Sequence, residues 1–339
     1  MEIRHYRQVP ADLVAEIRDF ALLIAENDGI AAFDEQSLLN LERPGAAHYL
    51  IPTAFGSDLD SLNSTAGLSV AVPALAVLNL ENGNAELAVH PDWRRRGWGA
   101  SLLAELQKVA RELPEGVSPL LWAHGTLPAA QSLATAAGLQ VERTLLVLEN
   151  KVAKLLAPRS ENKLADLRQG KNWQLRPFTA ASIAKGQDIA TLARLNQIIF
   201  AQHPEQGKLT VTDFRQRFSQ EWFSPDLCFL IYPRAELGEE LEGRLGGAFE
   251  ENLPASSAIG FLWLKPVDDF TVELYVVGIL PEMQGAGIGS ALMERLPLLA
   301  AASGYRRIIL YVDADNVPAL RAYKKGGFCE LEKHTGYFL

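Results

Sequence analysis

The sequence predicts an α/β protein made of two tandem domains, each with a mixed, mostly antiparallel sheet flanked by helices. One observation is the glycine-rich turn Gln284-Gly285-Ala286-Gly287-Ile288-Gly289, which follows a β-branched strand and leads directly into an apolar helix. Another is a related turn upstream, Arg94-Arg95-Arg96-Gly97-Trp98-Gly99, in the same strand–turn–helix setting. The third is the length of 339 residues, which exceeds most single hydrophobic cores. Together these observations predict a duplicated domain.

The spacing of the motifs supports the duplication. Arg94 of the upstream turn corresponds to Gln284 of the downstream turn, and Gly138-Leu139 corresponds to Gly327-Phe328. The two separations differ by a single residue, and this near-constant offset predicts domains of about 150 to 170 residues, a common size. We place the first domain at residues 1–156, a polar linker at 157–172 and the second domain at 173–339. In each domain we expect a strand, helices, antiparallel strands, the turn with its helix, a strand, a helix and a last strand.

Composition indicates an ordinary globular protein, with 48% hydrophobic and 22% charged residues. The net charge of −9 argues against a nucleic-acid partner. The N-terminus lacks the apolar core of a signal peptide, and no apolar run approaches the ~20 residues that span a bilayer. The two cysteines, Cys228 and Cys329, have no metal-site or disulfide spacing. We therefore expect a soluble cytoplasmic monomer with no metal and no membrane partner.

The downstream turn has the properties of an anion site. Its glycines allow the backbone to approach a ligand closely, and the free N–H groups at the start of the helix attract phosphate. Residues Gln284 to Gly289 could bind a diphosphate, and the strand edge at Val277-Gly278-Ile279 could pair with an amide-bearing arm such as pantetheine. A tight strand-to-helix connection without a ligand is the alternative. Asn316 and Tyr323, which follow a second strand, favour the ligand.

This turn, together with Asn316, Tyr323 and the closing Gly327-Phe328, resembles the acyl-CoA site of the GNAT superfamily of N-acetyltransferases. The resemblance implies a transferase, an acyltransferase with acetyl-CoA as co-substrate. In the second copy it implies cofactor contacts at Val277, Gly278, Ile279, Gln284, Gly285, Ala286, Gly287, Ile288, Gly289, Ser290, Asn316, Val317, Pro318, Ala319, Leu320 and Arg321. In the first copy it implies contacts at Leu87, Ala88, Val89, Arg95, Arg96, Gly97, Trp98, Gly99 and Ala100.

Two residues are candidates for the chemistry. Tyr323 matches the general-acid tyrosine of the superfamily, since a phenol with a pKa near ~10 can protonate a thiolate held close to it. The alternative interpretation of Tyr323 is a core aromatic residue on an amphipathic helix. Glu273 is the candidate base, acting directly or through a water, and its alternative is a solvent-facing strand residue. The backbone N–H groups of the nearby bend are the expected oxyanion donors.

Further segments resemble the mycothiol synthase family, a tandem-domain branch of the superfamily. They are Phe200 to Gly207, Glu221 to Phe223, Gly260 to Lys265, Glu273 to Gly278, Leu310 to Asn316 and Trp122 to Leu127. The resemblance covers nearly the whole chain and implies acetylation of the cysteine amino group of a cysteinyl-glucosaminyl-inositol. It implies substrate contacts at Glu35, Glu205, Lys265, Glu273 and Tyr311. Because Glu35 belongs to the first copy, we expect the acceptor in a cleft between the domains. The plainer alternative for these residues is a solvated or packed side chain.

The first copy keeps the turn but lacks the catalytic side chains. At the two offsets, the counterparts of Glu273, Tyr323 and Asn316 are Gly83, Ala134 and Leu127. We therefore expect a first domain that binds acetyl-CoA but does not turn it over, with His124 fixing its fold.

Two other functions stay open. One keeps the chemistry and changes the acceptor to an aminoglycoside, a polyamine or a peptide N-terminus. The other is a non-catalytic acyl-CoA sensor, against which Glu273 and Tyr323 argue.

Overall fold

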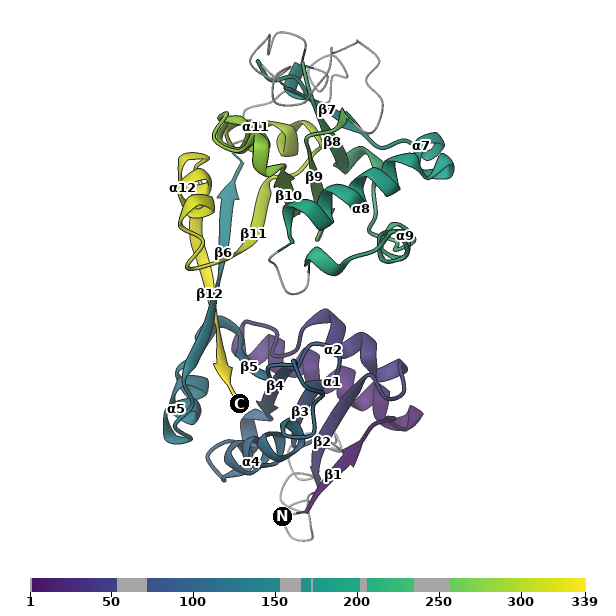
Figure 1. The fold of residues 1–339 in the computed structure, drawn as a ribbon. Coiled ribbons are helices and arrows are strands. Elements are labelled where there is room, and N and C mark those ends of the chain that lie inside the picture. Colours follow the sequence, from purple (N-terminus) through teal and green to yellow (C-terminus); the bar gives the residue numbers. More distant parts are fainter. Residues whose placement is uncertain (1, 54–71, 153–165, 172, 202–205, 235–256) are drawn as a thin grey trace. The chain divides into compact units, whose positions relative to one another are not determined.

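The computed structural model describes residues 2–53, 72–152, 166–171, 173–201, 206–234 and 257–339. The chain forms two compact units (Figure 1), of which unit 1 comprises Met1–Leu145 with Glu332–Leu339 and unit 2 comprises Leu146–Leu331. Each unit has a mixed, mostly antiparallel sheet with helices on its faces, as the sequence predicts. Most of the predicted linker, 157–172, lies outside the described residues.

Unit 1 contains β1 (Glu2–Tyr6), α1 (Ala11–Asp28), α2 (Glu35–Leu39), η1 (Asn40–Glu42), β2 (Ala47–Thr53), β3 (Ala74–Asn79), β4 (Asn84–Val89), η2 (Pro91–Trp93), α4 (Trp98–Ala110), β5 (Leu120–Ala123), η3 (His124–Thr126) and α5 (Pro128–Ala136). Its strand order is β1-β2-β3-β4-β5-β12, with antiparallel pairs except for β4 and β5, which are parallel.

The sheet of unit 1 is buried on both faces, and β3 shows how its sequence achieves this. All six residues of β3 are buried. Ala74, Ala76 and Leu78 pack on the α4 side, while Leu75 and Val77 pack with buried residues of α1. Because successive strand residues point to opposite faces, a strand that is buried at every position indicates a sheet covered on both sides.

Unit 2 contains β7 (Trp173–Pro177), α7 (Ala180–Lys185), α8 (Gln187–Ile199), η4 (Gln206–Lys208), α9 (Val211–Phe218), η5 (Pro225–Leu227), β8 (Cys228–Pro233), β9 (Gly260–Pro266), β10 (Thr271–Ile279), η8 (Pro281–Met283), α11 (Ile288–Ala302), β11 (Arg307–Asp313) and α12 (Val317–Lys325). Its strand order is β6-β11-β10-β9-β8-β7, and β10 and β11 are parallel.

The helices of unit 2 cover both faces of its sheet (Figure 1). Gly278 of β10 faces α8, since a Cβ there would lie 2.9 Å from Ile199. Ile279, the next residue, faces the opposite side, where its Cδ1 would lie 3.7 Å from a Cβ at Gly289 of α11. Consecutive residues of β10 therefore touch helices on opposite faces, as the period of a strand requires.

Two strands pass from one unit to the other. They are β6 (Val141–Lys151) and β12 (Cys329–Phe338), whose residues divide between the units at Leu145/Leu146 and at Leu331/Glu332. Thr335–Phe338 of β12 pair with Leu120–Ala123 of β5 inside unit 1. Unit 1 therefore consists of two segments of the sequence, whereas unit 2 is a single segment.

Among the described residues, no helix is both long enough and apolar enough to cross a membrane.

The end of the chain should stabilise unit 1 through one face of β12. Tyr337 is 7% exposed and belongs to the core of unit 1, whereas its neighbour Phe338 is 49% exposed. We expect Tyr337→Ala to lower the free energy of unfolding by about 3 kcal/mol and Phe338→Ala by less than about 1 kcal/mol. Urea unfolding measures both, and equal losses would contradict the assigned packing of β12.

Candidate active site

In unit 2 the two parallel strands separate soon after they begin to pair. Residues Thr271–Glu273 of β10 pair with Arg307–Ile309 of β11, and β10 then continues to Ile279. On its other side, β10 stays paired with β9 as far as Ile279. The backbone of residues 274–279 therefore forms a strand edge that faces the gap. Such an edge can bind an extended ligand that carries amide groups.

A β-bulge lies at the start of this edge. The pairing of β10 with β9 shifts by one residue between Leu274 and Val276, which makes Tyr275 the extra residue. A bulge bends its strand and changes the direction of nearby side chains. The Tyr275 ring lies 5.0 Å from that of Trp263, in edge-to-face contact. Tyr275 therefore lies on the same face of the sheet as Trp263, whose ring also contacts Phe214 and Phe218 of α9.

The predicted turn, Gln284 to Gly289, has a backbone conformation that favours glycine. Gly285 and Gly287 have φ values of 82° and 76°, a region that favours glycine, and, apart from their neighbours along the chain, no described residue has an atom within 4 Å of the position of a Cβ at either glycine. The Gln284 side chain donates a hydrogen bond of 3.3 Å to the Ile279 carbonyl, which ties the turn to the strand.

Helix α11 begins directly after the turn. Gly287 occupies its N-cap position, where no side chain accepts a hydrogen bond from the first backbone N–H groups. These N–H groups have no partner within the helix. The positive end of the helix dipole lies at the same point, so the turn has the properties of an anion site.

Unit 1 repeats this backbone at the offset predicted from the sequence. Arg95 has a φ of 63° and Gly97 one of 86°, and α4 begins at Trp98. Arg94 donates from Nε to the Val89 carbonyl at 3.0 Å, as Gln284 does to Ile279. The agreement confirms that the two turns are copies. The predicted cofactor contacts Leu87 to Val89 lie on β4, and Arg95 to Ala100 lie on the turn and the start of α4.

The Arg94 guanidinium has a structural role. Its Nη1 and Nη2 donate to the two carboxylate oxygens of Asp28 at 2.8 and 2.7 Å. Burial acts to raise the pKa of Asp28, but the hydrogen bonds from Arg94 and Asn27 outweigh it and lower that pKa. Because this bidentate pair anchors the turn to α1, we assign Arg94 to the scaffold of the turn.

The helix that carries Tyr323 follows β11. Asn316 is the N-cap of α12 and accepts a hydrogen bond from the Ala319 backbone at 3.2 Å. This contact explains an asparagine at this position by capping alone. Where the helix ends, Gly326 approaches α11 so closely that a Cβ there would lie 3.0 Å from the Met293 carbonyl oxygen. Gly326, directly before the closing Gly327-Phe328, therefore allows α12 to pack closely on α11.

Tyr323 lies half-buried on α12, with its ring 5.8 Å from that of Phe328 in edge-to-face contact. Burial raises the pKa of Tyr323 to about 12, so the phenol keeps its proton at neutral pH. None of the described residues forms a hydrogen bond with its hydroxyl. The structure is thus compatible both with a core aromatic and with a proton donor.

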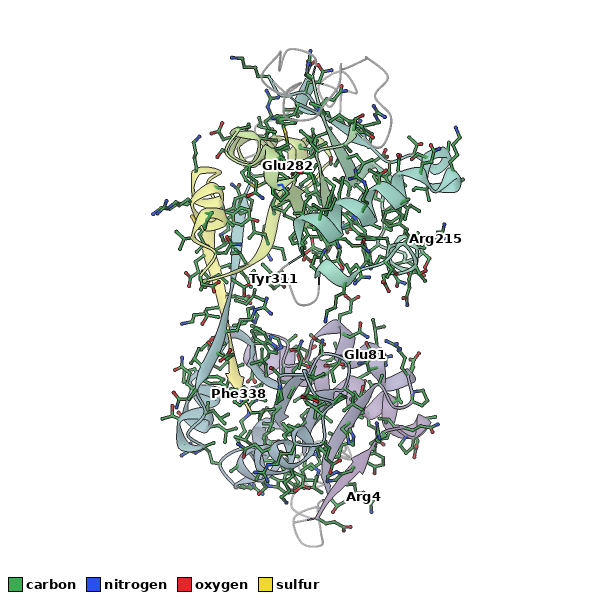
Figure 2. All side chains as sticks on the ribbon, in the orientation of Figure 1. Arg4, Glu81, Arg215, Glu282, Tyr311 and Phe338 are labelled. Carbon is green, nitrogen blue, oxygen red and sulfur yellow. The ribbon has the colours of Figure 1, made fainter. Side chains whose placement is uncertain are left out.

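Three predicted acceptor contacts share one face of the unit 2 sheet. The half-buried Glu273 is the cross-strand partner of Lys265 and pairs with Ile309 of β11. Tyr311, two residues beyond Ile309 and 48% exposed, points to the same side near the end of β11 (Figure 2). Of the other two, Glu35 begins α2 in unit 1, and Glu205 lies outside the described residues.

The register corrects one correspondence between the copies. Asn84 pairs with Leu120 in unit 1, and Glu273 pairs with Ile309 in unit 2. The number of residues from Asn84 to Glu273, and from Leu120 to Ile309, is the same as from Gly138 to Gly327. The counterpart of Glu273 is therefore Asn84 rather than Gly83. The extra residue is Tyr275, whose bulge has no equivalent in the pairing of β4 with β3. Asn84 accepts a hydrogen bond of 3.1 Å from the indole of Trp122, and Trp122 occupies the position that corresponds to Tyr311.

Unit 1 also contains a buried polar chain that sequence reasoning largely missed. Glu86 Oε1 lies 2.8 Å from His124 Nε2, and His124 Nδ1 lies 3.0 Å from His334 Nδ1. Glu86 is only 1% exposed, and burial raises its pKa, opposed by the hydrogen bond with His124. Both ring nitrogens of His124 are engaged, so His124 joins β4, η3 and β12 and has no nitrogen left for a substrate proton.

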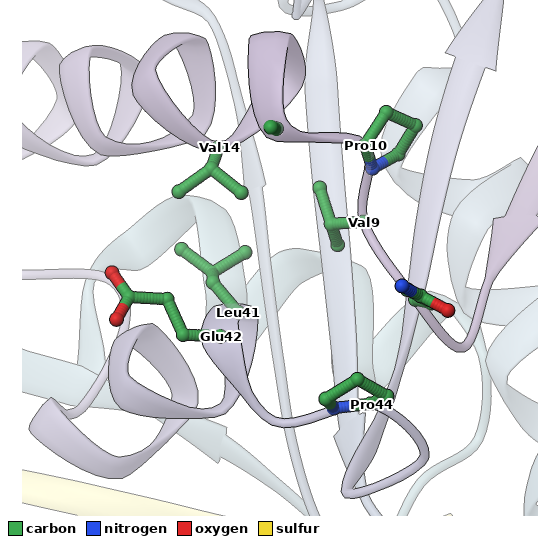
Figure 3. Close-up of a pocket in the computed structure, with 8 residues that line it drawn as sticks. Val9, Pro10, Val14, Leu41, Glu42 and Pro44 are labelled. Atoms are coloured by element: carbon green, nitrogen blue, oxygen red, sulfur yellow. The ribbon is translucent and has the colours of Figure 1, made fainter.

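A surface pocket of about 450 Å³ lies elsewhere in unit 1, between α1 and η1 (Figure 3). It is lined by Gln8, Val9, Pro10, Ala11, Val14, Leu41, Glu42 and Pro44. None of the predicted site residues lines it.

Comparison with known proteins identifies the family. The family model described as "Acetyltransferase (GNAT) family" matches residues 76–138 and 203–328, a segment in each copy. The chain therefore belongs to the GNAT family of acetyltransferases, enzymes that transfer an acetyl group from acetyl-CoA.

Two relatives are named "Mycothiol acetyltransferase". One, from Clavibacter sepedonicus, is 35% identical over 99% of this chain and 94% of its own. The other, from Kineococcus radiotolerans, is 35% identical over 97% of this chain and 95% of its own. Among solved structures, a GCN5-related N-acetyltransferase from Sphaerobacter thermophilus has a TM-score of 0.62 at 18% identity and covers 99% of this chain and 94% of its own. A tandem GNAT protein from the clavulanic acid biosynthesis pathway has a TM-score of 0.61 at 15% identity and covers 100% and 98%. These two structures support the tandem fold alone.

The buried polar chain predicts a pH dependence of stability. Burial, followed by the charge of His124, lowers the pKa of His334 to about 4 from 6.5. As the pH falls from 6.5 towards 4, the unfolded chain binds a proton that the folded chain does not, so stability falls. We expect the loss in free energy of unfolding between pH 7 and pH 5 to be about 2 kcal/mol smaller in His334→Asn than in the wild type.

Urea unfolding of both proteins at the two pH values measures this difference. His48 and His90, whose pKa values burial also lowers, are present in both proteins and cancel in the comparison. An identical pH dependence in the two proteins would contradict the assignment to His334.

Proposed function

We propose that this enzyme acetylates the cysteine amino group of cysteinyl-glucosaminyl-inositol with acetyl-CoA and so makes mycothiol, as a mycothiol synthase. The observation that carries the proposal is the identity of 31 to 35% with relatives named "Mycothiol acetyltransferase", which extends over at least 95% of this chain. The proposal includes a cytoplasmic monomer that needs no metal.

The geometry of unit 2 supports acetyl-CoA binding in the gap between β10 and β11. The strand edge at Val277, Gly278 and Ile279 would pair with the pantetheine arm. The turn from Gln284 and the start of α11 as far as Ser290 would bind the diphosphate through backbone N–H groups. Residues Asn316 to Arg321 begin α12 on the other side of the gap and would complete the site.

The chemistry needs a base for the ammonium group and an acid for the departing thiolate. We propose that Glu273, at the last paired position before the strands separate, takes the proton from the amine directly or through a water. The neutral amine then attacks the thioester carbonyl, whose developing charge the backbone N–H groups of the bend would stabilise. As the carbon–sulfur bond breaks, Tyr323 donates its phenolic proton to the sulfur, and the extra proton on the nitrogen of the new amide returns to the Tyr323 phenolate through water.

We also propose that unit 1 binds acetyl-CoA without turning it over. Its strands β4 and β5 separate after Ala85 and Leu121, and its turn has the same backbone as that of unit 2. The counterpart of Tyr323 is Ala134, a buried core residue that cannot donate a proton. The counterpart of Glu273 is Asn84, a neutral amide that cannot act as a base.

The acceptor can be tested directly. Purified protein with acetyl-CoA should acetylate the cysteinyl pseudodisaccharide with a kcat/KM at least about 100-fold above that for free cysteine, because the sugar and inositol hydroxyls add hydrogen bonds. Glu35→Gln and Glu205→Gln should raise the acceptor KM and leave the acetyl-CoA KM unchanged, with the exposed Glu81→Gln as the matched control. Equal rates with free cysteine or unrelated amines would refute the acceptor assignment.

The proton donor is tested by Tyr323→Phe, which keeps the ring and its packing. Removal of a general acid should lower kcat by about 100-fold or more while the Kd of acetyl-CoA stays within about twofold. Steady-state kinetics and isothermal titration calorimetry measure the two quantities. Unchanged turnover would remove Tyr323 from the mechanism, and a lost affinity would indicate a packing role.

A further inference from the structure

We propose that Trp222 and Tyr275 are positioning residues that hold the ammonium group of Lys265 beside Glu273, and so determine the affinity for a hydroxyl-rich acceptor. This inference rests on the proposed function, because it assigns a role on the acceptor side of the same site.

Lys265 lies against two aromatic rings. Its Nζ is 4.8 Å from the centroid of the Trp222 ring and 5.7 Å from that of Tyr275. Both distances lie within the ~6 Å over which a ring attracts a cation. A lysine side chain is long and flexible, and in water it would occupy many rotamers. The two rings restrict it to one region of the sheet surface.

The rings themselves are held from behind. Trp222 and Tyr275 lie 5.7 Å apart and both contact Trp263, which is fully buried. The Tyr275 hydroxyl accepts a hydrogen bond of 3.2 Å from Nε of Arg217 on α9. The bulge in β10 is part of the same arrangement, because Tyr275 is its extra residue. These contacts fix the positions of both rings before any ligand binds.

The position of the ammonium group explains why it should be fixed. Lys265 is the cross-strand partner of Glu273, the proposed base, so both side chains project from the same face of the sheet. Side chains opposite each other in an antiparallel pair have Cβ atoms about 5 Å apart. An ammonium group on the same face of the sheet as the base can donate hydrogen bonds to the hydroxyl oxygens of an acceptor whose amine lies at Glu273. It also repels a second cation, which disfavours polyamines.

A double-mutant cycle on the full-length enzyme tests the inference. Steady-state kinetics with acetyl-CoA and the cysteinyl pseudodisaccharide would compare the wild type, Trp222→Leu, Lys265→Met and the double variant. We expect Trp222→Leu to raise the acceptor KM about fivefold, with kcat and the acetyl-CoA KM changed by less than about twofold. In the Lys265→Met background, Trp222→Leu should add almost nothing, because the interaction is already lost.

Trp222→Phe is the matched control, since it keeps an aromatic face and should raise the acceptor KM by less than about twofold. Thermal unfolding of each variant checks the fold, and Tyr275→Leu takes the place of Trp222→Leu in the cycle if the latter does not fold. Additive effects in the double variant, or equal losses in Trp222→Phe and Trp222→Leu, would overturn the positioning role. A wild type that does not acetylate this acceptor would instead overturn the proposed function.

Discussion

The early separation of β10 from β11 is the constraint on which the rest of the site depends. The ladder between these parallel strands ends at Glu273 and Ile309, and beyond it no strand among the described residues pairs with that side of β10. Backbone groups left at such an edge need hydrogen bonds from another source. The turn and α11 follow directly from β10, and α12 follows from β11. The turn with α11 is one element that could bind the cofactor, and α12 is the other. They therefore begin on opposite sides of the gap between β10 and β11.

The bulge at Tyr275 distinguishes the two copies within otherwise matching backbones. It explains why the step from Asn84 to Glu273, before the bulge, is one residue shorter than the step from Arg94 to Gln284, after it. One inserted residue bends the strand locally and shifts its pairing with β9 by one residue, while regular pairing continues on both sides. It also adds an aromatic side chain to the face that carries Glu273 and Lys265. A small insertion in one copy thus changes the acceptor face and leaves the turn intact.

Local features of the site could be predicted from the sequence, and long-range ones could not. A glycine with a positive φ, such as Gly285 or Gly287, is required by the turn itself and can be recognised in the motif. The chain from Glu86 through His124 to His334 joins residues 38 and 210 positions apart, which no local pattern encodes. The bulge was missed for the same reason, and with it the correspondence of Glu273 to Asn84. The acceptor contacts came only from the resemblance to relatives.

The two copies carry different side chains at four equivalent positions. In unit 1, Asn84 accepts from Trp122, and Glu86 bonds to His124, so the polar groups around the gap stabilise the fold through one another. In unit 2 the same four positions hold Glu273, Tyr311, Val276 and Asp313. The carboxylate of Glu273 thus has a neutral amide, that of Asn84, as its counterpart in unit 1. The difference in side chains supports the proposal that the duplication kept two coenzyme sites and one reactive centre. It also explains how unit 1 could lose its chemistry without losing its backbone, since the turn depends on its own dihedral angles and not on the side chains across the gap.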